Sequence, residues 1–184
     1  MKTYIPSLTP IYKPEMWIFA GVEGAGKTSM MGPYGFLEGI MIETTLTDAD
    51  IRFIMETSHS HFTRLIYIGL DTLEEHLARI ENRVRKGGAS ADLEVVKKQF
   101  EHRFESLAKV LPLCNEVRFY DNDNGFRLVG IYHKNYMEVS KKSCRWFQEF
   151  LVSSFLDTSH GKSHTEDEIS YIQGELSGKD GCAT

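Results

Sequence analysis

Short apolar runs alternate along this chain with longer stretches in which apolar residues recur at helical spacing. The first four runs lack the apolar–polar alternation of a half-exposed strand. Continuous apolar runs of this length are typical of strands that are buried on both faces of a sheet. We therefore predict strands at Met16–Ala20, Ile40–Glu43, Leu65–Leu70, Val117–Tyr120 and Arg127–Tyr132.

The stretches between the runs predict helices, at Asp48–Ser58, Thr72–Lys86, Leu93–Leu111 and Met137–Leu156. Thr72 and Glu75 have the spacing of a capping box, and Gly87-Gly88 is suited to end the helix that they begin. The last helix carries aromatic residues that we expect to pack on the sheet: Trp146, Phe147, Phe150 and Phe155. Strands that alternate with helices predict an α/β fold with a mostly parallel central sheet.

Composition divides the 184 residues into three parts. Residues 1–15 contain three prolines and are expected to form an extended lead-in. Residues 16–156 hold all the predicted strands and helices, and their number suits one folded domain. From Asp157 the sequence becomes polar, so residues 157–184 are expected to form a loosely packed tail.

Charge and cysteine content narrow the class of protein. The net charge of −5 leaves no basic surface of the kind that binds nucleic acid, so we expect no nucleic-acid partner. Three scattered cysteines are too few for a disulfide framework or a zinc site, which favours a reducing, cytoplasmic setting. No stretch approaches the roughly 18 apolar residues of a membrane span, so no membrane partner is expected.

The strongest motif follows the first predicted strand. It matches G-x-x-x-x-G-K-[ST] over eight residues: Gly21, Val22, Glu23, Gly24, Ala25, Gly26, Lys27 and Thr28. Glycines let such a loop turn tightly and point its N–H groups inward, which makes a nest for an anion next to the positive end of a helix. The alternative is an ordinary glycine-rich turn between a strand and a helix. The motif favours a nucleotide site, with ATP and Mg²⁺ as cofactors.

Two residues of the motif have separate roles in this chemistry. Lys27 would reach the β- and γ-phosphates of the nucleotide, and the Thr28 hydroxyl is placed to ligate Mg²⁺.

Three further phrases follow the motif in order. Glu43-Thr44-Thr45-Leu46 closes the second predicted strand, Arg83-Val84-Arg85-Lys86-Gly87-Gly88 closes a helix, and Tyr120-Asp121-Asn122 closes the fourth strand. With the glycine loop, this order resembles the zeta-toxin family of P-loop kinases, particularly its small chromosomal members. The resemblance covers about residues 16–133.

The resemblance implies a P-loop NTPase/kinase-like three-layer sandwich that binds ATP and Mg²⁺ and phosphorylates a hydroxyl group of a small metabolite. In the toxin members this substrate is UDP-N-acetylglucosamine, and a small helical antitoxin neutralises the enzyme. Carried over to this chain, the resemblance makes Glu43 and Thr45 contacts of the sugar nucleotide. It also makes Arg83, or else Arg79 or Arg103, the cation that stabilises the transferred phosphoryl group. Lys27, Arg83 and Glu43 are then the candidate catalytic residues.

The chain departs from the family pattern in two places. Only residues 28–42 separate Lys27 from Glu43, and Pro33 in this span limits the helix after the loop to one or two turns. The segment that supplies a general-base aspartate in the family is absent from this span, and Asp48 or Asp50 is the candidate substitute. After Gly87-Gly88, Lys97-Lys98-Gln99 stands where family members have an arginine cluster.

Two functions therefore stay open. The first is an active zeta-toxin-like kinase. The second is a catalytically degenerate module that binds a nucleotide or another protein. The individual residues also have structural explanations: Glu43 as a surface charge, Arg83 as part of a helical ion pair, and Asp121-Asn122 as a turn.

Overall fold

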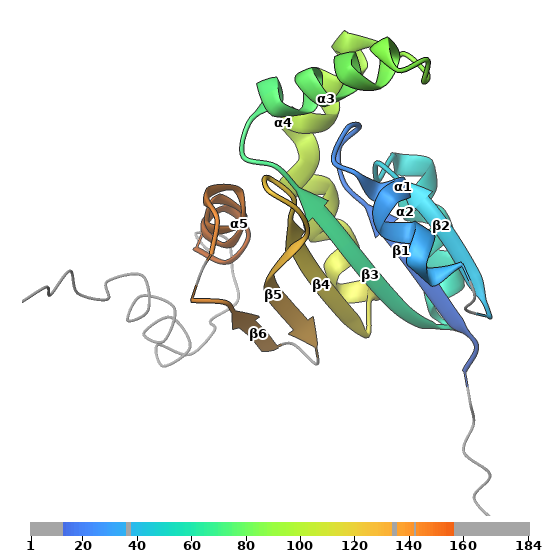
Figure 1. Cartoon of the computed structure of the whole chain (residues 1–184). Helices are drawn as coiled ribbons and strands as arrows, with labels where there is room; N and C mark the ends of the chain where they lie inside the picture. The colour runs from blue at the N-terminus through green and yellow to red at the C-terminus, as the bar shows by residue number, and fades with distance from the viewer. Residues whose placement is uncertain (1–12, 36–37, 134–135, 142, 157–184) are drawn as a thin grey trace, which may run out of the picture.

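A computed structural model describes residues 13–35, 38–133, 136–141 and 143–156 (Figure 1). Its centre is one six-stranded sheet with the strand order β2-β1-β3-β4-β5-β6. The first four strands are parallel, and the last two are antiparallel to their neighbours. The strands are β1 (Glu15–Ala20), β2 (Ile40–Thr44), β3 (Phe62–Gly69), β4 (Glu116–Asp121), β5 (Arg127–His133) and β6 (Tyr136–Val139). The predicted α/β fold with a mostly parallel sheet is confirmed.

Five α-helices connect or follow these strands in the described part of the chain: α1 (Lys27–Met31), α2 (Asp48–Ser58), α3 (Leu73–Arg85), α4 (Leu93–Val110) and α5 (Arg145–Leu151). Three shorter helical turns accompany them: η1 (Gly32–Tyr34), η2 (Leu111–Leu113) and η3 (Val152–Leu156). No helix among the described residues is both long enough and apolar enough to cross a lipid bilayer.

The two faces of the sheet are covered unequally. Helices α2, α4 and α5 pack on one face, where Ile54, Leu107 and Phe147 share a buried cluster with side chains from β1, β3, β4 and β5. The other face carries a smaller cluster in which α1 and η1 cover Phe19 and Ile66. The outer layer on this second face is therefore reduced to α1 and η1. The cause is the short connection from the loop to β2, in which Pro33 ends regular helix.

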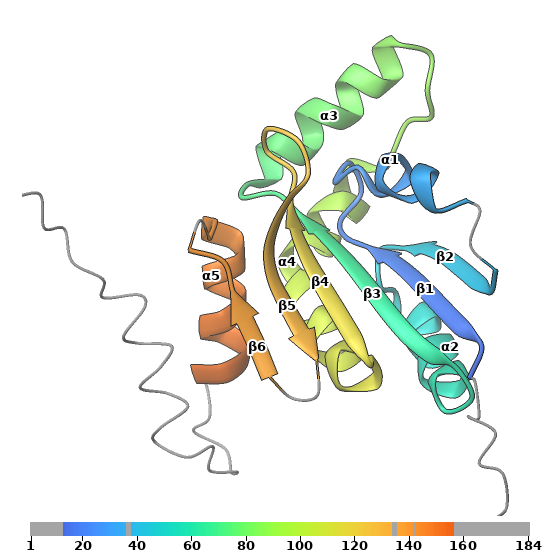
Figure 2. The same cartoon turned by 60° about the horizontal axis from the view of Figure 1, so that its bottom comes forward.

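Helix α3 lies over the ends of the strands instead of against a face of the sheet (Figure 2). Both hydrogen bonds of the predicted capping box are present between Thr72 and Glu75. At the other end, Gly87 has a φ of 84°, and Gly88 donates a backbone hydrogen bond to Arg83. This is the left-handed C-terminal turn that the two glycines predicted, and it directs the chain back into α4.

The prediction of one helix over Met137–Leu156 is wrong in its first part. Residues Tyr136–Val139 form β6, which pairs antiparallel with β5, and the helix begins only at Arg145. An edge strand of four residues has little pattern of its own, and its pairing with β5 decides its conformation. Most of the predicted N-terminal lead-in, residues 1–12, and the predicted tail, residues 157–184, lie outside the described residues. The last residue assigned to the lead-in, Glu15, is already the first residue of β1.

Candidate functional site

The glycine loop leaves β1 and curves back into α1. Its three glycines have positive φ angles: 149° at Gly21, 84° at Gly24 and 100° at Gly26. At position 26 the φ of 100° favours glycine, and a Cβ there would also lie 2.6 Å from the amide nitrogen Nδ2 of Asn122. The first intrahelical bond of α1 is donated by Met30 to Gly26, which leaves the N–H groups of residues 27–29 at the open end of the helix. Because α1 has five residues, the loop itself contributes most of the anion-binding character.

Lys27 is the buried charge of this site, with only 5% of its surface exposed. Its Nζ donates a hydrogen bond to the carbonyl oxygen of Val22 at 3.3 Å. Burial lowers the pKa of Lys27, and the carboxylates of Glu23 and Glu43 oppose this shift. An ammonium group that is buried among backbone N–H groups favours the binding of an anion.

Glu23 is the residue of the loop with the most partners on the surrounding helices. Its N–H donates to the Gln99 side chain on α4 at 3.2 Å, and its carbonyl oxygen lies 2.9 Å from Nδ1 of His76 on α3. Its carboxylate accepts a hydrogen bond from Nη1 of Arg83 at 2.7 Å. The loop is therefore fixed from both α3 and α4 before any ligand binds.

His76 gives this arrangement a testable pH dependence. His76 is 1% exposed, and burial lowers its pKa to about 4. In the unfolded chain the pKa of His76 is about 6.5. Between pH 6.5 and 4 the unfolded state therefore binds a proton that the folded state does not bind. We expect the free energy of unfolding to fall by about 3 kcal/mol through this residue as the pH decreases from 6.5 to 4. Urea unfolding of the native chain and of His76→Gln across this range measures the contribution by difference.

Exposed His102 on α4 supplies the control, because His102→Gln keeps His76 and should retain the loss of stability toward pH 4. An NMR titration of the ring protons gives a second measurement that needs no variant. If the His76 ring takes up its proton above pH 6, the prediction is wrong.

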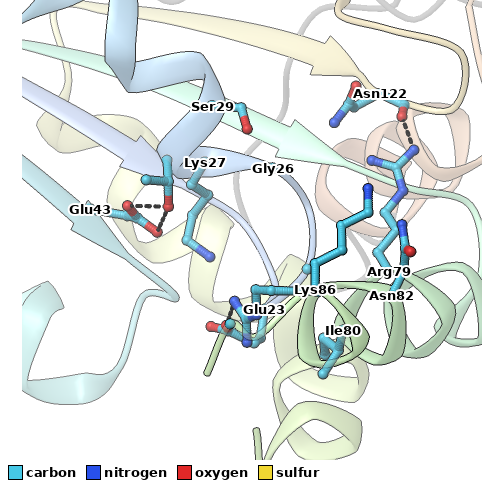
Figure 3. Close-up of a pocket in the computed structure, with 14 residues that line it drawn as sticks. Glu23, Gly26, Lys27, Ser29, Glu43, Arg79, Ile80, Asn82, Lys86 and Asn122 are labelled. Atoms are coloured by element: carbon cyan, nitrogen blue, oxygen red, sulfur yellow. Dashed lines mark hydrogen bonds and ion pairs between the residues drawn. The ribbon is translucent and has the colours of Figure 1, made fainter. Parts of the chain in front are cut away.

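Thr28 and Glu43 meet at the opposite side of the loop. The Thr28 hydroxyl donates to the Glu43 carboxylate, with oxygen distances of 2.9 and 3.1 Å (Figure 3). Glu43 comes from β2, which pairs in parallel with β1, so the ends of the two strands bring the carboxylate to the start of α1. A hydroxyl beside a carboxylate forms the kind of oxygen pair that Mg²⁺ accepts as ligands.

Helix α3 supplies the other wall of a pocket of about 490 Å³. Arg79 donates hydrogen bonds to the carbonyl oxygens of Asn122 and Asp123. Arg83 contacts Glu23, and the Lys86 side chain extends toward Arg79 (Figure 3). The pocket is lined by four cationic residues, Lys27, Arg79, Arg83 and Lys86, and by two acidic ones, Glu23 and Glu43. This excess of positive charge suits a polyphosphate.

The structure brings most of the predicted site residues to this one pocket. Seven of them line it: Glu23, Gly24, Gly26, Lys27, Thr28, Glu43 and Arg83. The other four predicted residues, which do not line it, are Gly21, Val22, Ala25 and Thr45. Val22 packs instead with Ile80 and Val96, and Ala25 packs with the small cluster under α1.

Of the residues named as alternatives, Arg79 lines the pocket, whereas Arg103, Asp48 and Asp50 lie elsewhere. Arg103 stacks on Phe100 and Phe104 within α4 and contacts Glu149. Asp50 accepts hydrogen bonds from Thr44 and Thr47 as part of a helix cap, and neither Asp48 nor Asp50 lines the pocket.

Sequence reasoning missed His76, Gln99 and Lys86. Nothing in the spacing of His76 or Gln99 indicates contact with Glu23, because the sequence separations are 53 and 76 residues. Lys86 had a weak signal, since it lies one turn after Asn82 and Arg83 on the same helix face. The cation pattern at positions 79, 83 and 86 could have identified the face of α3 that lines the pocket.

No family model matches this chain, and no curated protein shows significant similarity to it. Solved structures with a similar fold do exist. They include the AvrRxo1-ORF1:AvrRxo1-ORF2 complex with sulphate ions, at a TM-score of 0.57 and 11% identity over 89% of this chain and 71% of that one. The native form of the complex matches with a TM-score of 0.57 at 13% identity, again over 89% and 71% of the two chains. The complex with ATP matches with a TM-score of 0.54 at 10% identity, over 90% and 72%. At these identities the similarity is one of fold.

Proposed function

We propose that this chain is a zeta-toxin-like kinase that transfers the γ-phosphoryl group of ATP to a hydroxyl group of a small metabolite. A sugar nucleotide such as UDP-N-acetylglucosamine is the first candidate acceptor. One observation carries the proposal. The glycine loop, the buried Lys27 and the Thr28–Glu43 pair face one pocket together with Arg79 and Arg83 of α3. Positioned cations and a metal supply most of the stabilisation that phosphoryl transfer needs.

Two features of the loop support a nucleoside triphosphate as its ligand. The backbone at position 26 favours glycine, and the N–H groups of residues 27–29 precede the first hydrogen bond within α1. The AvrRxo1-ORF1:AvrRxo1-ORF2 complex was solved with ATP in a similar fold, which supports ATP as the nucleotide.

The metal would be held by Thr28 and Glu43, whose oxygen atoms already lie within 3.1 Å of each other. Mg²⁺ bound there would neutralise charge on the phosphate oxygens. In this proposal Glu43 binds the metal, whereas the family resemblance implied that it contacts the substrate. Arg83 would stabilise the transferred group, with Glu23 holding its guanidinium group at the edge of the loop.

One observation favours the second function, a module that binds a nucleotide without turnover. Both acidic residues that line the pocket are engaged within the protein, Glu23 with Arg83 and Glu43 with Thr28. A general base for a hydroxyl acceptor would have to be freed from one of these contacts.

Phosphoryl transfer from ATP, measured with Mg²⁺ across a panel of sugar nucleotides and nucleosides, decides between the two. We expect turnover with at least one acceptor, and a loss of about 100-fold in Glu43→Gln. The exposed Glu56 on α2 provides a control with the same change of charge, and Glu56→Gln should keep full activity. Tight ATP binding without turnover would favour the module, and no ATP binding would reject both.

A small protein partner is also part of the proposal. Each matched structure is a complex of AvrRxo1-ORF1 with AvrRxo1-ORF2, and this supports a comparable pairing for this chain.

A further inference from the structure

The hairpin between β4 and β5 is attached directly to the glycine loop. The Asn122 side chain donates a hydrogen bond from Nδ2 to the carbonyl oxygen of Ala25 at 2.8 Å. Arg79 donates to the carbonyl oxygens of Asn122 and Asp123, which joins α3 to the same hairpin. The first residues of the hairpin therefore have a fixed place beside the phosphate-binding loop.

Phe126 is the aromatic side chain of this hairpin, and it lies next to Gly26. Two of its ring carbons, Cζ and Cε1, are 3.6 and 3.7 Å from the point where a Cβ of residue 26 would lie. Phe126 nevertheless stays 39% exposed. A large apolar side chain left open to water at the rim of a charged pocket is available to a ligand with an apolar face.

The pocket has two sides that carry different residues. Glu43, which is hydrogen-bonded to Thr28, lies on one side, while Arg79 and Asn122 lie on the other (Figure 3). A nucleotide whose terminal phosphates and metal occupy the Thr28–Glu43 side would extend its nucleoside toward Asn122 and the hairpin. The base is flat and aromatic, and stacking on aromatic rings accepts any base.

We infer that Phe126 and the β4–β5 hairpin form a nucleobase subsite, in which the base of the bound nucleotide stacks on the Phe126 ring. This inference rests on the proposed function, because it requires that the phosphates bind at the glycine loop. Asp123 and Asn124 are exposed on the same hairpin and would offer polar groups to the edge of the base. The subsite also gives a function to one residue of the Tyr120-Asp121-Asn122 segment, because Asn122 attaches the hairpin to the glycine loop.

The test compares two ligands that share a triphosphate and differ in the nucleoside: ATP and inorganic triphosphate. Calorimetric titration of the native chain is expected to show tighter binding of ATP. In Phe126→Ala, the affinity for ATP should fall about 5- to 100-fold, while the affinity for triphosphate stays unchanged. Phe126→Trp keeps an aromatic face and should retain the preference for ATP.

Leu128 lies in the same hairpin with the same exposure, 39%, and supplies the matched control. Leu128→Ala should leave both affinities unchanged. The subsite is refuted if the native chain binds ATP no more tightly than triphosphate, if Phe126→Ala leaves ATP binding unchanged, or if Phe126→Ala weakens both ligands equally. Binding of neither ligand by the native chain would instead reject the proposed function itself.

Discussion

Replacing Lys27 by alanine is expected to weaken ATP binding roughly 100-fold. The Lys27 ammonium group is buried beside the loop, where Nζ now donates to the Val22 carbonyl oxygen. A bound phosphate would replace that carbonyl with a charged acceptor, and hydrogen bonds between charged groups are the strong ones. Their loss inside a pocket costs about 2–3 kcal/mol, which corresponds to roughly a 100-fold change in affinity.

A fluorescent ATP analogue titrated against the native chain and Lys27→Ala measures this effect. Lys98 on α4 is exposed and outside the pocket, so Lys98→Ala removes the same charge as a control and should bind normally. A variant Lys27→Arg separates charge from geometry, since its larger planar group does not fit the space of a buried ammonium. Equal affinities of the native chain and Lys27→Ala would reject the assignment of the loop.

The glycine loop was predictable because the residues that determine its conformation are adjacent in the sequence. Backbone turns and a nest of N–H groups depend on local glycines, and the apolar run before them places the loop at the end of a strand. The capping box at Thr72 and the stop at Gly87 were predictable for the same reason. Helix α2 also has the predicted bounds, Asp48–Ser58, because its periodicity and its cap agree.

Contacts between distant segments were not predictable. Glu43 was expected at the site because of the family resemblance, but its hydrogen bond with Thr28 follows from the pairing of β2 with β1. The contacts of Glu23 with His76 and Gln99 require that α3 lies over the strand ends and that α4 packs against the sheet. The prediction of a helix where β6 lies was wrong for the same reason, because pairing with β5 determines the conformation of these residues.

Trp146 on α5 is the position where a single truncation is expected to cost the most stability. The side chain is 1% exposed and lies so close to the end of β3 that a Cβ at Gly69 would be 2.5 Å from its ring. Its backbone N–H donates to Asp71 at 2.8 Å, which fixes the start of α5 above the sheet. Phe147 and Phe150 are buried beside it as predicted, while the Phe155 side chain lies outside the described structure.

In Trp146→Ala we expect the free energy of unfolding to fall by about 3–5 kcal/mol, because the indole ring leaves a cavity that rigid strands cannot close. Urea unfolding at neutral pH measures the change. Val152, exposed just after α5, serves as the control, and Val152→Ala should change stability by less than about 0.5 kcal/mol. Trp146→Phe should lose less than the alanine variant, since it refills part of the cavity. A loss below about 1.5 kcal/mol in Trp146→Ala would mean that α5 does not support the end of the sheet that carries the site.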